Sequence, residues 1–310
     1  MPHSHSVAEI YRGRFAPSPS GPLHFGSLVT ALGSALDAQA HAGEWYLRID
    51  DLDPPRVAPG AIDAILRALD AYGFEWQGAV QYQSARHAAY AAALAALRQR
   101  GAVYPCACTR REIADSVVGQ RGAAIYPGTC RDGMAPGKTA RALRLNTQGA
   151  RVCLRDRLQG PLSLDLAREV GDFVVRRADG LFAYQLAAVV DDAELGITHI
   201  VRGADLIDSS LRQIYLQQLL HLPEPRYLHL PVVVNALGEK LSKQTLAPPL
   251  DITHPGPALV RALVFLNQAP PLELVHAPLA EIWAWARNHW APARLPAART
   301  SDGEAVMNQA

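Results

Sequence analysis

The 310-residue sequence lacks the features that mark membrane-spanning, secreted or strongly basic proteins. No uninterrupted apolar stretch reaches about eighteen residues, which argues against a membrane span. The N-terminus has no apolar segment of the secretory type, so we expect a cytoplasmic protein. The formal net charge is only +1. A nucleic-acid partner would therefore have to meet a local basic patch rather than a basic protein.

Cysteine is scarce, and its positions are informative. Three of the four cysteines, Cys106, Cys108 and Cys130, lie close together in the sequence. In a cytoplasmic protein such clustering favours a metal site over disulfides. Three thiolates favour zinc, although buried cysteines without metal are the simpler reading. No histidine lies between Cys106 and Cys130, so a fourth ligand must come from elsewhere.

The first part of the chain has a strand, helix and strand pattern. Residues 10–18 resemble a short strand that ends in a turn. Residues 26–43 place apolar side chains at helical spacing, and 44–54 resemble a second strand that is stopped by prolines. This order predicts a βαβ unit, and hence a parallel sheet in an α/β fold.

Helical and strand-like segments alternate over the rest of the chain. Two further helices are predicted at 60–74 and 84–101, the second with Ser84 as its N-cap. The periodicity weakens over 104–178, which we interpret as an insertion into the sheet. The remaining predictions are buried-strand character at 183–203, a helix at 205–220, and a strand followed by a loop at 227–244. We therefore divide the chain into a core of 1–247 and a small helical C-terminal region of 248–310.

Two loops have the chemistry of phosphate binding. His24 and Gly26 lie where the first strand passes into the first helix, and helix N-termini attract phosphate. In "EKLSKQ", Lys243 could meet the charge that develops on a leaving pyrophosphate. Taken singly, each loop is better explained as an ordinary structural or solvated turn.

Taken together, the motifs resemble the glutamyl branch of the class I aminoacyl-tRNA synthetases. The resemblance rests on "RFAPSPSGPLHFGSL", "LRIDDLDPPR" and "EKLSKQ", and extends through "YQLAAVVDD" and "HIVRGADL". "PLHFGS" stands where that class has its HIGH signature, and "KLSKQ" where it has KMSKS. This resemblance implies a Rossmann-like catalytic core that binds ATP, with magnesium accompanying the nucleotide.

The chain ends soon after Lys243, where a glutamyl-tRNA synthetase has a large anticodon-binding region. This brevity and the cysteine pattern resemble the glutamyl-queuosine tRNA(Asp) synthetases. The resemblance implies a monomeric ligase that activates L-glutamate without tRNA and transfers it to queuosine in the anticodon of tRNA(Asp). It implies no DNA or membrane partner. The alternatives are a truncated synthetase that charges a tRNA 3′ end, and a non-catalytic synthetase-like binder.

The resemblance also implies the site residues. The expected catalytic residues are His24 and Lys243. ATP is expected to contact His24, Gly26, Ser27, Lys240, Ser242 and Lys243. Glutamate is expected to contact Arg14, Phe15, Ala16, Pro17, Ser18, Asp50, Tyr184 and Arg202. Two arginines and one acid complement a molecule with two carboxylates and one ammonium.

The sequence departs from the family pattern at four of these motif positions. Asp50 stands where the family usually has Glu, so we expect weaker glutamate binding at most. Ser27 replaces the second histidine of HIGH, and Leu241 and Gln244 replace Met and Ser of KMSKS. These changes leave more of the phosphate contact to His24 and Lys243.

For the metal, the resemblance implies one structural zinc site made of Cys106, Cys108, Tyr126 and Cys130, with Cys153 or water as the alternative fourth ligand. A run of arginines in the insertion is either a solvated face or a surface for RNA phosphates. These arginines are Arg141, Arg144, Arg151, Arg155 and Arg157.

Overall fold

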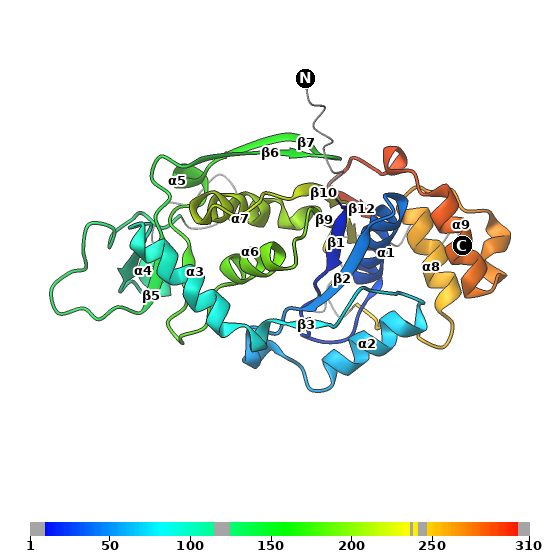
Figure 1. The fold of residues 1–310 in the computed structure, drawn as a ribbon, viewed down its shortest axis with the longest axis horizontal. Coiled ribbons are helices and arrows are strands. Elements are labelled where there is room, and N and C mark those ends of the chain that lie inside the picture. Colours follow the sequence, from blue (N-terminus) through cyan, green and yellow to red (C-terminus); the bar gives the residue numbers. More distant parts are fainter. Residues whose placement is uncertain (1–9, 115–124, 236–237, 241–246, 303–310) are drawn as a thin grey trace, which may run out of the picture.

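A parallel sheet forms the centre of the molecule (Figure 1). The computed structural model describes residues 10–114, 125–235, 238–240 and 247–302. Strand β1 pairs with β2 and β2 with β3, while β9 pairs with β10, all in parallel. The Thr198 amide donates to the Arg12 carbonyl at 3.0 Å, which brings β9 beside β1. These strands are β1 (Arg12–Phe15), β2 (Glu44–Ile49), β3 (Gln81–Tyr82), β9 (His199–Gly203) and β10 (Arg226–Leu230).

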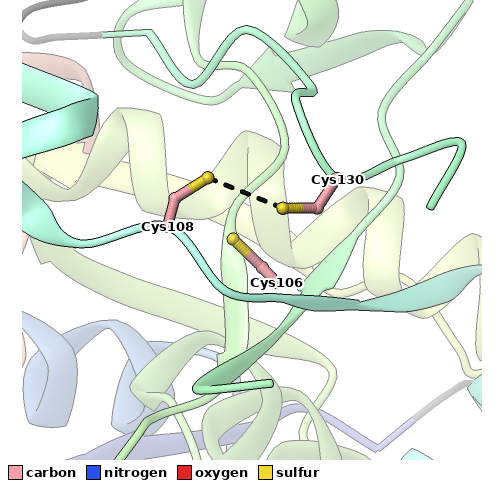
Figure 2. A group of neighbouring side chains, drawn as sticks. All are labelled: Cys106, Cys108 and Cys130. Atoms are coloured by element: carbon pink, nitrogen blue, oxygen red, sulfur yellow. Dashed lines mark hydrogen bonds between the residues drawn. The ribbon is translucent and has the colours of Figure 1, made fainter. Parts of the chain in front are cut away.

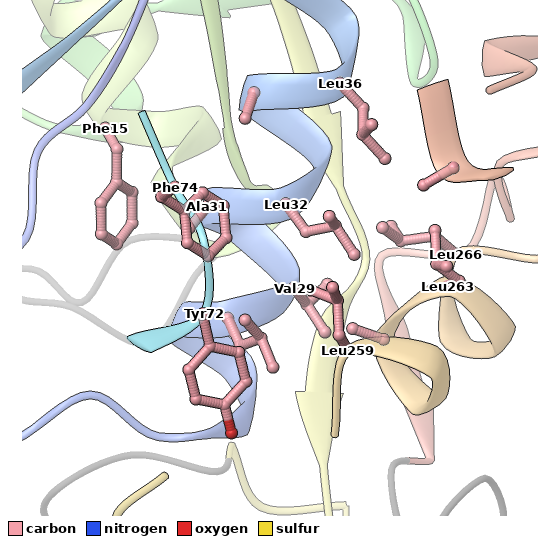
Figure 3. Packing of buried hydrophobic residues seen from close by; sticks show 14 of the residues in the cluster. Phe15, Val29, Ala31, Leu32, Leu36, Tyr72, Phe74, Leu259, Leu263 and Leu266 are labelled. Atoms are coloured by element: carbon pink, nitrogen blue, oxygen red, sulfur yellow. The ribbon is translucent and has the colours of Figure 1, made fainter. Parts of the chain in front are cut away.

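Helix α1 (Phe25–Ala40) connects β1 to β2, which confirms the predicted βαβ unit. Its side chains pack in two directions (Figure 3). Val29, Leu32 and Leu36 face helix α8 (Pro255–Phe265), and other side chains of α1 belong to a buried cluster that also includes residues of β1 and β2. Each leucine buried in this way contributes about 1.5–3 kcal/mol to folding. The helix is thereby fixed at the centre of the core.

The C-terminal part shares this core. Helices α8 and α9 (Leu279–His289) contribute apolar side chains to the same buried cluster as α1. A feature absent from our prediction is strand β12 (Thr300–Asp302), which pairs in parallel with β11 (Val232–Val234). Residues 300–302 therefore return to the strand that follows β10.

Two of the predicted elements were wrong in detail. Residues 183–203 contain helix α6 (Tyr184–Glu194) before strand β9, because a continuous buried apolar run has no period that separates helix from strand. Ser84 does not cap the next helix: its N–H and Oγ donate to Asp51 at 2.8 and 2.6 Å, and the helix begins at His87. The remaining central helices are α2 (Ala61–Ala71), α3 (His87–Gln99) and α7 (Ile207–Leu220).

The segment predicted as an insertion contains short antiparallel sheets. Strand β5 lies between β4 and β8, and β6 pairs with β7. Its elements are β4 (Val103–Cys106), α4 (Arg110–Ala114), β5 (Ala142–Leu145), β6 (Arg151–Asp156), β7 (Gly160–Asp165), α5 (Leu166–Glu169) and β8 (Val174–Arg176). Within the described ranges, no helix has the length and hydropathy needed to cross a membrane.

Candidate active site

A cavity of about 610 Å³ opens where β1 and β9 end and α1 begins. Ligands of open α/β sheets bind at this edge of the parallel strands. The loop from β1 to α1 forms one side, and Gly21 within it has a φ of 151°, which only glycine adopts easily. The lining residues are Arg14, Phe15, Ala16, Pro17, Ser18, Ser20, Leu23, His24, Gly26, Ser27, Thr30, Arg56, Tyr184, Val201, Arg202, Gly203, Asp205, Leu206, Pro231, Val232, Val233 and Lys240.

Most of the predicted ATP and glutamate residues line this cavity together. The exception among the described residues is Asp50, whose carboxylate lies behind the wall. Ser242 and Lys243 lie outside the described residues, as do Leu241 and Gln244. The sequence therefore located the cavity, although it did not reveal how its charged side chains are held.

His24 caps the helix that points into the cavity. It precedes the first turn of α1, and its Nδ1 accepts a hydrogen bond from the Ser27 amide at 3.4 Å. The first turn of a helix has backbone N–H groups without helical partners and a partial positive charge. No acidic side chain lies in this turn. The end of the helix is thus suited to an anionic group such as phosphate.

Arg14 enters the cavity from β1 and is held by a buried carboxylate. Its Nε and Nη2 donate to the two oxygens of Asp192 at 3.1 and 3.4 Å. Arg48 donates from Nη1 to Asp192 at 2.6 Å and from Nε to Asp50 at 2.6 Å. Burial favours the neutral form of Asp192, but the charges of Arg14 and Arg48 outweigh it and lower its pKa. Burial dominates at Asp50 and raises its pKa.

Arg202 enters the cavity from β9 and is held by neutral groups. Its Nη2 donates to Ser210 and Gln213, both at 2.7 Å, and its Nη1 donates to the Tyr184 hydroxyl at 3.3 Å. Its Nε is buried and has no hydrogen-bond partner in the described part of the chain. A buried donor without a partner favours an incoming acceptor.

Sequence reasoning missed several residues of this site. Arg56 and Asp205 line the cavity, and Asp205 forms an ion pair with Lys240 at 2.5 Å. Arg48 and Asp192 lie behind the wall. The only sequence signal for Asp192 is two consecutive acids in the apolar run "AAVVDD", where a buried charge needs a partner.

The three clustered cysteines meet in space (Figure 2). The sulfur atoms of Cys106, Cys108 and Cys130 all lie within 4.8 Å of one another, and those of Cys108 and Cys130 are 3.6 Å apart. A tetrahedral zinc with thiolates at about 2.3 Å separates its sulfur ligands by about 3.8 Å. The Tyr126 hydroxyl oxygen lies 3.4 Å from Sγ of Cys106 and 3.5 Å from Sγ of Cys108. Cys153 is exposed on β6, outside this cluster.

The surroundings act on the ionisation of the cluster in both directions, since burial raises the pKa of Cys108 and of Tyr126 while other groups favour negative charge. Arg144 donates from Nε to Cys106 Sγ at 3.3 Å, and its guanidinium stacks 3.9 Å from the centre of the Tyr126 ring. Burial opposes ionisation of Cys130, but hydrogen bonds with Tyr126 and the Ala107 backbone outweigh it and lower its pKa to about 7. Thiolates are the form that binds metal. The donor set and its surroundings therefore fit a zinc ion.

Two of the five arginines proposed as an RNA surface have structural partners instead. Arg144 is buried beside the cysteines, and Arg157 forms a paired contact with Asp37 at 2.6 and 2.9 Å. Arg144 is buried, whereas Arg157 is exposed and only its guanidinium reaches the buried carboxylate of Asp37, whose charge needs a partner. Arg141, Arg151 and Arg155 are exposed.

Comparison with known proteins identifies the relatives of this chain. Residues 11–254 match the family model of class I (E and Q) tRNA synthetases, catalytic domain. The glutamyl-Q tRNA(Asp) synthetase of Aromatoleum aromaticum is 59% identical over 290 residues, which are 94% of this chain and 92% of that protein. The protein of the same name from Dechloromonas aromatica is 57% identical over 90% of this chain and 94% of its own length.

A solved structure agrees with the fold. The crystal structure of glutamate-tRNA synthetase from Elizabethkingia anophelis matches with a TM-score of 0.77, covering 97% of this chain and 70% of that chain. Their sequence identity is 22%, so this likeness supports the fold alone. It confirms the expected class I catalytic fold. By the matched domain and the relatives in sequence, the chain belongs to the glutamyl-Q tRNA(Asp) synthetase family of class I aminoacyl-tRNA synthetases.

Proposed function

We propose that this protein activates L-glutamate with ATP, without tRNA, and transfers the glutamyl group to queuosine in the anticodon of tRNA(Asp). The main support is its membership of the family whose members share more than half of its residues. The cavity supports the first half-reaction. Arg14 and Arg202 enter it from two strands, next to the N-terminus of a helix that has no acid in its first turn.

In the first step, an oxygen of the glutamate α-carboxylate attacks the α-phosphorus of ATP. The bond from that phosphorus to the bridging oxygen breaks, and pyrophosphate leaves with the electron pair. Arg14 and Arg202 would hold glutamate, with Phe15, Ala16, Pro17, Ser18, Asp50 and Tyr184 forming the rest of its pocket. His24, Gly26, Ser27, Lys240, Ser242 and Lys243 would hold the triphosphate, accompanied by magnesium. The catalytic contribution is positioning and charge stabilisation, with His24 and Lys243 contacting the phosphates.

In the second step, a hydroxyl of queuosine attacks the carbonyl carbon of glutamyl-adenylate. The carbon–oxygen bond to the phosphate breaks, AMP leaves, and the hydroxyl proton passes to solvent or to AMP. Neither half-reaction requires the protein to form a covalent bond. We expect the enzyme to act as a monomer in the cytoplasm, where its tRNA and ATP are found.

The first experiment locates the glutamyl group. The protein is incubated with ATP, labelled glutamate and tRNA(Asp), with and without queuosine, and the RNA is digested to nucleosides. Label on the anticodon nucleoside only when queuosine is present is the expected result. Label on the 3′ adenosine would instead identify an enzyme that charges tRNA. A glutamate-dependent exchange of pyrophosphate with no label on either tRNA would leave activation standing and refute the acceptor.

We also propose that Cys106, Cys108, Cys130 and Tyr126 bind one structural zinc ion. When bound, the metal would cross-link a segment that has only a small apolar cluster of its own. Supporting observations are the close approach of the three sulfurs and the hydroxyl oxygen beside them.

Cys106→Ser should lose metal and stability together. We expect bound zinc to fall below about one tenth of the native content, because an aliphatic hydroxyl does not ionise as a thiol or a phenol does and is a poor zinc ligand. Metal analysis and thermal unfolding measure the two effects. Cys153→Ser is the matched control and should retain both. Full zinc content in the Cys106 variant would remove this residue from the site.

A further inference from the structure

Two consecutive aspartates on α6 point to different parts of the protein. Asp191 and Asp192 are both buried, at 0% and 2% exposure. Asp192 contacts Arg14, which lines the cavity, and Arg48 behind it. Two adjacent carboxylates on one helix therefore differ in whether they contact a cavity residue.

The partners of Asp191 lie away from the cavity. It accepts hydrogen bonds from Arg86 Nε at 2.6 Å, from Gln83 Nε2 at 2.8 Å and from the Tyr90 hydroxyl at 2.8 Å. None of these three residues lines the cavity. Its contact with Arg48 is longer, at 3.8 Å. Asp191 therefore ties α6 to the segment that begins α3.

The partners of Asp192 connect two strands of the sheet. Arg14 lies on β1 and Arg48 on β2, and both donate to the same carboxylate. Arg48 also donates two hydrogen bonds to Asp50, from Nε to one oxygen at 2.6 Å and from Nη2 to the other at 3.5 Å. The result is a chain of four buried charges, Arg14, Asp192, Arg48 and Asp50, with no net charge.

These four charged side chains determine the orientation in which Arg14 faces a ligand. The Nε and Nη2 edge of the guanidinium is occupied by Asp192, and Nη1 makes no hydrogen bond with any described residue. A planar guanidinium held along one edge has a fixed orientation, so its remaining N–H groups have a fixed direction. Without Asp192, the side chain would keep its charge and lose that orientation.

We propose that Asp192 is a positioning residue for the amino-acid substrate: it orients Arg14 and, through Arg48, Asp50. This role rests on the proposed function, because it treats Arg14 and Asp50 as contacts of glutamate. Asp192 does not touch the substrate. Asp191, one residue earlier, makes its hydrogen bonds to Gln83, Arg86 and Tyr90 and approaches Arg48 only at 3.8 Å, so its role is stabilisation.

The test compares Asp192→Asn with Asp191→Asn in glutamate-dependent exchange of pyrophosphate into ATP. Asp192→Asn should raise the KM for glutamate about 10- to 100-fold, since small misplacements of a substrate-binding group cost this much, with the KM for ATP within about 2-fold of native. Asp191→Asn should keep both KM values within about 2-fold. Both variants should unfold at lower temperature, because each leaves a buried arginine with one fewer carboxylate.

A second variant decides the matter if Asp192→Asn does not fold. Asp192→Glu retains the charge while moving it by one methylene, and should raise the KM for glutamate by a smaller factor, about 3- to 10-fold. A native KM in the folded Asp192 variants, or an equal rise in Asp191→Asn, would overturn the positioning role alone. Absence of glutamate-dependent exchange by the native protein would overturn the proposed activation, and this role with it.

Discussion

The two arginines of the cavity are held in opposite ways. Arg14, on the β1 side, forms a two-point ion pair with the buried carboxylate of Asp192. Arg202, on the β9 side, donates to two hydroxyls and an amide oxygen. Among the described residues, no carboxylate lies within ion-pair distance of Arg202. One side of the cavity thus offers an arginine whose charge is compensated, and the other offers one whose charge is not.

This difference separates orientation from attraction. A carboxylate partner offsets the charge of Arg14, so that arginine contributes mainly a fixed geometry to a ligand. Neutral acceptors orient Arg202 and leave its positive charge for the ligand, in a setting where water is largely excluded. A ligand carboxylate therefore gains more from Arg202 than from Arg14.

A second buried chain stands behind Arg202. Ser210 Oγ lies 2.7 Å from His229 Nε2, and His229 Nδ1 lies 2.7 Å from an oxygen of Asp156. Asp156 is the last residue of β6, in the segment predicted as an insertion. Thus the β9 side of the cavity is linked to the small antiparallel sheets as well as to Tyr184 of α6, whereas the carboxylate that holds Arg14 comes from α6.

The largest expected effect separates the two arginines directly. Arg202→Ala should raise the KM for glutamate about 100-fold or more, because it removes charged hydrogen bonds worth about 1.5–3 kcal/mol each. It should cost less stability than Arg14→Ala, since it leaves neutral acceptors such as buried Gln213 without a partner rather than a buried charge. Arg14→Ala should show the reverse balance, with a smaller rise in KM and a loss of about 3 kcal/mol in the free energy of unfolding. Exchange kinetics and urea unfolding measure both. Equal effects of the two variants on both quantities would contradict the comparison.

A smaller effect is expected one step behind Arg202. Ser210→Ala removes an acceptor from Arg202 and a partner from His229, so the KM for glutamate should rise about 3- to 10-fold. Ser209→Ala is the matched control on the same helix, because Ser209 bonds to Gln185 instead. Its KM should stay at the native value. If the two serine variants have the same KM for glutamate, the hydrogen bond from Arg202 to Ser210 does not contribute to glutamate binding.

The last prediction concerns acid stability, and its effect on the KM for glutamate is expected to be the smallest. Burial, with the nearby charge of Arg157, lowers the pKa of His199 on β9 to about 4. The unfolded chain, with a histidine pKa near 6.5, therefore binds this proton first as the pH falls. The contribution of neutral His199 to the free energy of unfolding is therefore complete above about pH 6.5. It is lost as the pH falls toward about 4, at up to about 1.4 kcal/mol per pH unit.

His199→Phe retains a ring that can stack on Tyr11, 3.9 Å away between ring centres, and it does not titrate. In urea unfolding at about pH 7 and about pH 5, the free energy of unfolding of this variant should change less between the two pH values than that of the native protein. If the free energy of unfolding changes with pH as much as in the native protein, other groups, such as buried His229, cause the loss of stability in acid. On the β1 side, Asp192 stays ionised through this range, since its pKa is lowered.

Local patterns in the sequence determined a large part of this protein. The strand, helix and strand order, the phosphate-binding character of the loop before α1 and the grouping of three cysteines all follow from spacing over short distances. Backbone hydrogen bonding and helical periodicity act over such distances, and for this reason they can be read from the chain. The family motifs named Arg14, His24, Tyr184 and Arg202 as site residues, and in the structure all four line one cavity.

Only the tertiary structure decided which charges face each other. Arg14 and Asp192 are 178 residues apart in the chain, and nothing in either local sequence selects the other. The same holds for Arg144 and Arg157, which the sequence suggested as part of a solvated face or an RNA surface and whose partners in the structure are the Asp172 carbonyl and Asp37. Residues 184–194 form a helix that we had predicted as a strand. The prediction failed because a short apolar segment fits either structure until its neighbours in space are known. A buried charge must be compensated, but its partner is selected by proximity in space, which the order of residues does not record.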